Sequence, residues 1–127
     1  MGKHKPSGSG GSGGALEIQA EQTPRGLIAR IVGDLGVDQV DELDRQLHLL
    51  TVLKPQLAVL DLSRVPFVSS MAIGALVRFR NQVAEGGGRV ALAGMQKNVQ
   101  DSFLYTGLER VFALHKSVAE AVDAPDE

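Results

Sequence analysis

Residues 57–62, with the sequence LAVLDL, constrain the fold more than any other short stretch of this chain. All of them except Asp61 are apolar, and successive side chains of a strand point to opposite faces of a sheet. A strand that is apolar on both faces has to be covered on both sides, which is typical of the centre of an α/β sheet. The segment therefore predicts an α/β fold in which helices pack on the sheet.

Strand-like and helix-like periods alternate along the rest of the chain. Apolar runs predict strands at residues 16–20, 27–32, 57–62, 89–93 and 111–114. Helical spacing predicts helices at about 38–50, 70–84, 98–107 and 118–122. Asp38 is the expected N-cap of the first helix, Asn98 with Asp101 caps the third, and Gly107 ends it. This order predicts a single α/β domain with a mixed sheet of four to five strands and about four helices.

Length and local composition divide the chain into three parts. Residues 1–14 (MGKHKPSGSGGSGG) have nothing to bury in a core, so we expect a flexible Gly/Ser-rich leader, either a tag or a tail. Residues 15–124 carry the periodic segments and form the one domain that 127 residues allow. Residues 125–127 are a short tail.

Composition excludes several classes of function. The net charge is −2, and the leader holds two of the 13 Lys and Arg residues and no acidic one, which leaves −4 for the rest. An acidic chain with four Phe, one Tyr and no Trp lacks the surface that binds nucleic acid. The absence of cysteine excludes a disulfide framework and a Cys-based zinc site. No apolar run approaches the roughly 18 residues that cross a bilayer. We expect a cytoplasmic protein with no cofactor, no metal, and no membrane partner.

Residues 61–74 (DLSRVPFVSSMAIG) carry the most information about function. A buried strand ends in the carboxylate of Asp61, a short loop follows, and Ser69 and Ser70 open a helix. Capping requires only one serine. A phosphoryl group on the other would lie at the helix N-terminus, where anion binding is favourable, and would add charge without unfolding the domain.

This series resembles a known family. Asp61-Leu62-Ser63 at the strand end, Phe67 in the loop, Ser70 and Ile73-Gly74 are similar to the pattern of STAS domains in bacterial anti-sigma factor antagonists. The resemblance covers about 110 residues and includes Gly33-Asp34-Leu35, Gly107-Leu108, Val111-Phe112 and Ala119-Glu120-Ala121. It implies that Ser70 is the phosphorylated serine, with Ser69 as the alternative acceptor.

Four positions depart from the family pattern. Ser69 stands where the family has an acidic residue, Ala72 where it has glycine, and Met71 where it has serine or threonine. Gly36 replaces a second acidic residue before the first helix.

The helix that opens at Ser70 has two sides. The stripe on one side is apolar and is expected to face the sheet; it comprises Ala72, Leu76, Phe79 and Val83, with Ile73 and Val77 beside it. The opposite side combines small residues with an adaptable methionine, which suits docking. Together with the family resemblance, this predicts a partner-binding surface formed by Asp61, Ser63, Phe67, Ser69, Met71, Gly74, Ala75 and Arg78.

The resemblance implies a non-enzymatic regulator of transcription. The unphosphorylated protein would bind an anti-sigma factor serine kinase that holds its own ATP, and phosphorylation of Ser70 would end that binding. A serine phosphatase would reverse the modification. The alternative is a STAS-type scaffold or a module that senses a lipid or nucleotide, without a working phosphoswitch.

Other sites have weaker support. A receiver-domain phosphorylation site at Asp61 with Lys116 lacks the acidic pair that holds Mg²⁺. A hydrolase built from Ser70, His48 or His115, and Asp61 lacks the Gly-x-Ser-x-Gly elbow. Residues 86–88 (GGG) are not followed by Lys-Ser/Thr and indicate a turn instead of a phosphate loop.

The first helix also carries an acid cluster near its start. Its members are Asp38, Asp41, Glu42 and Asp44. We expect a solvated face that the helix dipole favours, or a contact for a basic partner.

Overall fold

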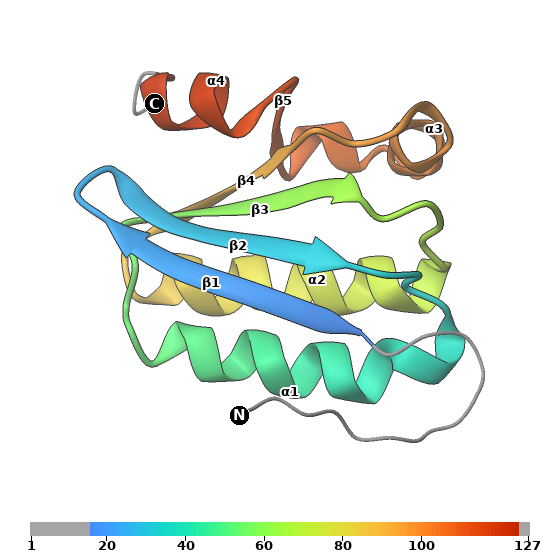
Figure 1. Cartoon of the computed structure of the whole chain (residues 1–127), viewed down its shortest axis with the longest axis horizontal. Helices are drawn as coiled ribbons and strands as arrows, with labels where there is room; N and C mark the ends of the chain where they lie inside the picture. Colours follow the sequence, from blue (N-terminus) through green and yellow to red (C-terminus); the bar gives the residue numbers. More distant parts are fainter. Residues whose placement is uncertain (1–15, 125–127) are drawn as a thin grey trace.

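The computed structural model describes residues 16–124, which form one five-stranded sheet with the order β1-β2-β3-β4-β5 (Figure 1). The strands are β1 (Glu17–Thr23), β2 (Gly26–Val32), β3 (Leu57–Arg64), β4 (Arg89–Ala93) and β5 (Ala113–His115). The helices are α1 (Val40–Thr51), α2 (Ser70–Glu85), α3 (Lys97–Tyr105) and α4 (Val118–Asp123), with short 3₁₀ turns η1 (Val37–Gln39) and η2 (Leu108–Arg110). β1 runs antiparallel to β2, and all other neighbours are parallel. The predicted mixed α/β fold is confirmed; the predicted leader and tail lie outside the described residues.

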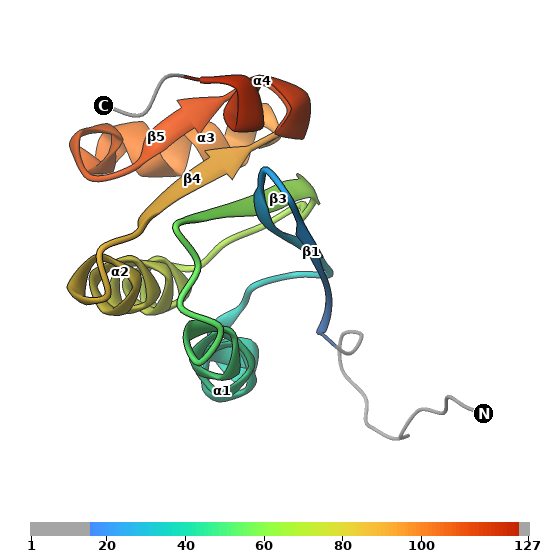
Figure 2. The ribbon, with the colours of Figure 1, turned by 90° about the vertical axis from the view of Figure 1, so that its left-hand side faces the viewer.

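Helices cover β3 on both faces, as its sequence requires. α1 and α2 lie side by side on one face of the sheet, and α4 packs on the other (Figures 1 and 2). Leu60 and Leu62 belong to the larger core under α1 and α2, whereas Val59 joins the smaller core with Ala121 of α4. The alternation of these side chains places apolar surface in both cores.

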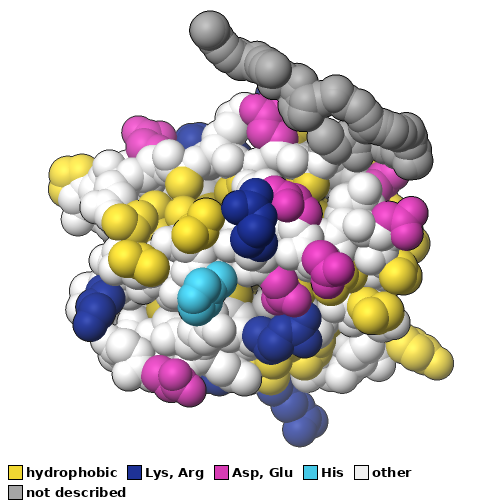
Figure 3. All heavy atoms as spheres, turned by 90° about the horizontal axis from the view of Figure 1, so that it is seen from below, with side chains coloured by type: hydrophobic (Ala, Val, Ile, Leu, Met, Phe, Trp, Pro, Cys, Tyr) yellow, Lys and Arg dark blue, Asp and Glu magenta, His cyan; other side chains and the backbone are white. Residues whose placement is uncertain are grey.

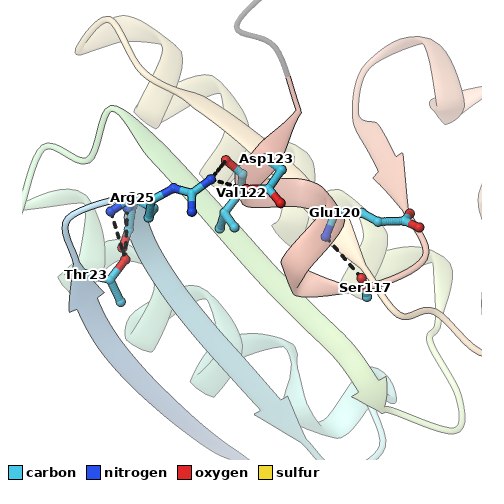
Figure 4. A network of polar contacts seen from close by, with 7 residues as sticks. Thr23, Arg25, Ser117, Glu120, Val122 and Asp123 are labelled. Carbon is cyan, nitrogen blue, oxygen red and sulfur yellow. Dashed lines mark hydrogen bonds and ion pairs between the residues drawn. The ribbon is translucent and has the colours of Figure 1, made fainter.

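A network of polar contacts ties the β1–β2 hairpin to α4 (Figure 4). The hydroxyl of Thr23 accepts hydrogen bonds from the amides of Arg25 and Gly26, each at 3.1 Å. The Arg25 side chain crosses to α4, where it donates to the carbonyl of Val122 at 3.3 Å and pairs with Asp123. Arg25 therefore links α4 to a hairpin that lies 98 positions earlier in the chain.

Several element boundaries differ from the sequence predictions: β1 extends to Thr23 and β3 to Arg64, and three further differences change the role of a named residue. Asp38 lies within η1 and does not cap α1, which begins at Val40 without a side-chain cap. α3 begins at Lys97 after Gln96, so Asn98 is not its cap; its side chain bonds to another segment instead. β5 covers 113–115 in place of 111–114, because Phe112 turns into the core, where its ring meets Phe103 edge to face at 6.0 Å. Gly107 does end α3, with a φ of 77° that favours glycine.

Candidate partner-binding site at the N-terminus of α2

The two serines at the start of α2 have different structural roles. Ser69 is the N-cap, and its hydroxyl oxygen accepts a hydrogen bond from the Ala72 amide at 3.1 Å. Ser70 is the first residue of the helix, is exposed, and its hydroxyl makes no hydrogen bond to any residue from 16 to 124. Capping thus occupies one hydroxyl and leaves the other accessible.

The loop between β3 and α2 is held rigidly by Leu35, which follows β2. The amide of Leu35 donates to the Phe67 carbonyl at 2.9 Å, and the Leu35 carbonyl accepts from the Ser69 amide at 2.8 Å. The loop side chains Val65 and Val68 are buried in the core. Phe67, between them, points outward with 51% of its surface exposed. Two buried anchors therefore fix the position of one exposed aromatic ring.

A second set of contacts reaches the same loop from the start of α3. The Asn98 side chain donates to the Pro66 carbonyl at 2.7 Å, and the Gln96 side chain donates to the Ser63 carbonyl at 3.2 Å. Figure 1 shows that this loop, η1 and α3 gather at the carboxyl ends of the parallel strands. Neither amide was predictable as a site residue, because nothing in local spacing shows that α3 meets this loop.

Asp61 supports the site from within. Only 17% of its side chain is exposed; one carboxylate oxygen accepts from the Ser63 amide at 3.0 Å, and the other lies 4.0 Å from Nε of Arg30. A carboxylate with this little exposure needs such partners. Asp61 therefore shapes the strand end, while the side chain of Ser63 lies at the surface.

Gly94 is a further supporting residue that was not predicted from the sequence. It has a φ of 73°, and a Cβ at this position would lie 3.1 Å from Cβ of Ser63 and 3.4 Å from the Asp61 carboxylate. A glycine directly after the predicted strand at 89–93 was the available signal. Its missing side chain lets β4 end close against the Asp61–Ser63 turn.

One predicted surface residue is misplaced. Ala75 is only 1% exposed, because α1 packs against α2 and covers that side of the helix, so the prediction that Ala75 faces outward is wrong. Ala75 instead lines a groove of about 430 Å³ between the two helices. Met71, in the first turn of α2, is exposed as predicted, with 56% of its surface accessible. The exposed residues Ser63, Phe67, Ser70 and Met71, together with the half-buried Gly74, form what we call the α2 N-terminal surface.

Arg78 lies at the margin of this surface and contacts α1. Its guanidinium donates to both carboxylate oxygens of Asp44, at 2.7 and 3.3 Å. Figure 3 shows the α1 face, where charged side chains and a histidine cross the middle and hydrophobic side chains gather toward the ends. Two members of the predicted acid cluster are neutralised here, since Asp44 pairs with Arg78 and Glu42 pairs with Arg45. Hydrogen bonds from Arg45 and Gln46 lower the pKa of Glu42, although slight desolvation opposes them.

The described residues bring no catalytic base or metal-ligand set to Ser70. Between residues 16 and 124, no three His, Cys, Asp or Glu side chains are placed to hold a metal ion. Neither His48 nor His115 bonds to the Ser70 hydroxyl. The same range contains no helix with the length and apolar character needed to cross a membrane.

Comparison with known proteins identifies the family. The family model described as "STAS domain" matches residues 17–121 of this chain. An anti-sigma factor antagonist from Mycobacterium paratuberculosis is similar in structure, with a TM-score of 0.78, 18% identity, and coverage of 85% of this chain and 92% of that one. The phosphorylated Bacillus cell fate determinant SpoIIAA is also similar, with a TM-score of 0.64, 18% identity, and coverage of 84% and 97%.

Not all similar structures are antagonists. The STAS domain of a SulP transporter from Vibrio cholerae has a TM-score of 0.57 and 17% identity, over 65% of this chain and 69% of that one. Sequence identities this low show that the fold is shared. They do not show that the binding partners are shared. The match over residues 17–121 covers most of the sequence, and the chain belongs to the STAS domain family.

Proposed function

We propose that this protein is a non-enzymatic anti-sigma factor antagonist. In its unphosphorylated form it binds an anti-sigma factor serine kinase through the α2 N-terminal surface, and phosphorylation of Ser70 ends that binding. The observation that carries the proposal is the division between the two serines: Ser69 caps the helix, and the Ser70 hydroxyl is exposed and unengaged among the described residues.

The exposed Ser70 hydroxyl suits phosphoryl transfer from a nucleotide held by the partner. Oγ attacks the γ-phosphorus of ATP, the new Oγ–P bond forms, and the bond to the β-phosphate oxygen breaks, so that ADP leaves with the electron pair. The hydroxyl proton passes to a base of the kinase. Hydrolysis by a phosphatase breaks the Oγ–P bond with water, releases inorganic phosphate, and restores the hydroxyl.

The start of α2 can accommodate the phosphate without loss of the fold. The Ala72 amide is bonded to Ser69, and Ile73 donates to the Ser69 carbonyl at 3.0 Å, so the amides of Ser70 and Met71 remain to face an anion. The positive end of the helix dipole favours the same position.

The added charge nevertheless opposes docking. Phosphorylation adds roughly −1.5 to −2 charge between two exposed apolar side chains, those of Phe67 and Met71. An unpaired charge that is buried at an interface costs several kcal/mol, and about 1.4 kcal/mol is a tenfold change in affinity. A modest mismatch therefore suffices to release the partner.

The second candidate is a STAS-type scaffold or ligand-sensing module. Ser69 stands at the family's acidic position, and its use as a cap leaves no carboxylate beside Ser70 to orient the hydroxyl or contact a kinase. Under this alternative Ser70 carries no signal, and a charge at this position leaves partner binding unchanged.

Affinity capture from the source organism's lysate separates the two candidates. The baits are wild type, Ser70→Ala, Ser70→Asp and Asn81→Asp, the last of which adds one negative charge near the other end of α2. We expect wild type, Ser70→Ala and Asn81→Asp to retain a protein with a histidine-kinase-like ATPase domain and Ser70→Asp to lose it. With ATP, the purified partner should phosphorylate wild type and leave Ser70→Ala unmodified. Retention of the same partner by all four baits would contradict the phosphoswitch and favour the scaffold.

A further inference from the structure

The loop between β3 and α2 loses its neighbouring strand on the β4 side. β4 ends at Ala93, while β3 continues beyond that level of the sheet. Carbonyl groups that leave a sheet still need hydrogen-bond donors. The Gln96 side chain supplies one to the Ser63 carbonyl at 3.2 Å. The Asn98 side chain supplies another to the Pro66 carbonyl at 2.7 Å, so side chains from the start of α3 take the place of a strand.

The start of α3 does without the usual stabilisation of a helix N-terminus. Its first turn has neither a side-chain cap nor an acidic residue, although both commonly stabilise this end of a helix. Gln96 occupies the N-cap position, but its side chain bonds to the loop and not to the helix. Asparagine is a preferred cap, yet Asn98 lies two positions past the N-cap and bonds to the loop as well. A local rule that is broken without a local gain is typical of a functional position.

The Asn98 contact fixes one of the two peptide groups that flank Phe67. The Pro66 carbonyl, which Asn98 holds, belongs to the same planar peptide group as the Phe67 nitrogen. The Phe67 carbonyl belongs to the next peptide group and accepts from the Leu35 amide at 2.9 Å. When both planes are fixed, the direction of the Phe67 side chain is fixed too, although its ring is 51% exposed. Asn98 therefore helps to aim an exposed aromatic side chain.

We propose that Asn98, supported by Gln96, is a positioning residue for partner binding at the α2 N-terminal surface. The inference rests on the proposed function, because Phe67 belongs to the surface that binds the anti-sigma factor kinase. Without the Asn98 bond, the peptide group before Phe67 is free to turn, and the binding-competent direction of the ring is only one of several. The apparent affinity falls in proportion to the competent fraction. Phosphoryl transfer itself is unaffected, since Asn98 bonds to the loop and not to the Ser70 hydroxyl.

Amide hydrogen exchange of the full chain tests whether Asn98 holds the loop. The reporter is the Leu35 amide, because its bond to the Phe67 carbonyl breaks when the loop opens. We expect Asn98→Ala to speed its exchange about tenfold or more. Asn98→Asp keeps the shape but has no amide donor, and should do the same. Gln100→Ala is the matched control, since Gln100 is exposed on the same helix and its side chain bonds to no described residue. Unchanged exchange in α1 will show that each variant is folded.

Phosphorylation kinetics with the kinase captured by wild type test whether the held loop matters for binding. Asn98→Ala should raise KM for the protein substrate about fivefold or more and leave kcat close to that of wild type. Gln100→Ala should match wild type in both constants. A residue that only stabilised the fold would not separate the two constants in this way.

The two measurements separate this proposal from the proposed function. Unchanged Leu35 exchange in Asn98→Ala overturns the proposal, whether or not a kinase is found. Faster exchange with an unchanged KM also overturns it, since Asn98 is then a structural contact without effect on binding. If wild type captures no kinase, the proposed function fails, and the exchange data alone decide whether Asn98 positions the loop of Phe67.

Discussion

The hydroxyl of Ser69 lies 3.1 Å from the amide of Ala72 and accepts its hydrogen bond, which closes the first turn of α2. Loss of this bond leaves a helix amide without its partner, at a typical cost of about 1 kcal/mol. The adjacent Ser70 hydroxyl makes no comparable contact with the described residues.

Ser69→Ala is therefore expected to lower the free energy of unfolding by about 1 kcal/mol. Ser70→Ala should change it by less than about 0.5 kcal/mol, since it is an exposed substitution without a lost contact. Urea denaturation of both variants beside wild type measures the difference. An equal or larger loss with Ser70→Ala would show that the capping assignment is wrong.

Phe67 should contribute to partner binding and little to stability. It is half exposed on a loop that Val65, Val68 and the Leu35 backbone hold in place. Under the proposed function, Phe67→Ala is expected to weaken binding of the anti-sigma factor kinase about tenfold or more, as removal of an exposed aromatic anchor does. The unfolding free energy should change by less than about 0.5 kcal/mol.

Leu49→Ala is the matched control for Phe67, since Leu49 is an equally exposed apolar residue on α1. Calorimetry with the captured kinase gives both affinities. Equal effects of the two substitutions would place the interface elsewhere.

Gly94 should tolerate alanine worse than Gly87 does. Both have positive φ, 73° and 92°, which costs an L-residue about 1–2 kcal/mol. At Gly94 the new Cβ also lies 3.1 Å from Cβ of Ser63, whereas at Gly87 it meets nothing within 4 Å. We expect Gly94→Ala to be the more destabilising in thermal unfolding and to shift the Ser63 amide resonance. Equal melting temperatures of the two variants would show that β4 shifts away from Ser63 at no cost in free energy.

The pKa of Glu42 should depend on Arg45. Hydrogen bonds from Arg45 and Gln46 lower the Glu42 pKa in the folded protein. A lowered folded-state pKa stabilises the fold above the unfolded-state pKa, and this contribution is lost as pH falls through the folded-state value. The contribution is small, because the side chains of Arg45 and Glu42 are 63% and 42% exposed and solvent screens the pair. Carboxyl NMR titration should show the Glu42 pKa rise toward its ordinary value in Arg45→Gln and stay unchanged in Arg80→Gln.

The elements with a strong local pattern were predictable from sequence. The doubly apolar β3 requires cover on both faces, and β4 was predicted with its observed bounds, Arg89–Ala93. The start of α2 at Ser70 and the exposure of Met71 were predicted as well. These features depend on periods of two or 3.6 residues and on capping chemistry, which act over a few neighbouring positions.

The sequence by itself determined the α/β layering, the place of the two serines, and the family pattern around them. Only the tertiary structure decided which of the two serines is the helix cap and which side of α2 is covered by α1. It also decided that the Asn98 side chain holds the loop that carries Phe67. The physical reason is that periodicity shows that a face is buried but not what buries it. Ala75 lies under α1 and Asn98 lies 32 positions from Pro66, so both depend on contacts between segments far apart in the chain.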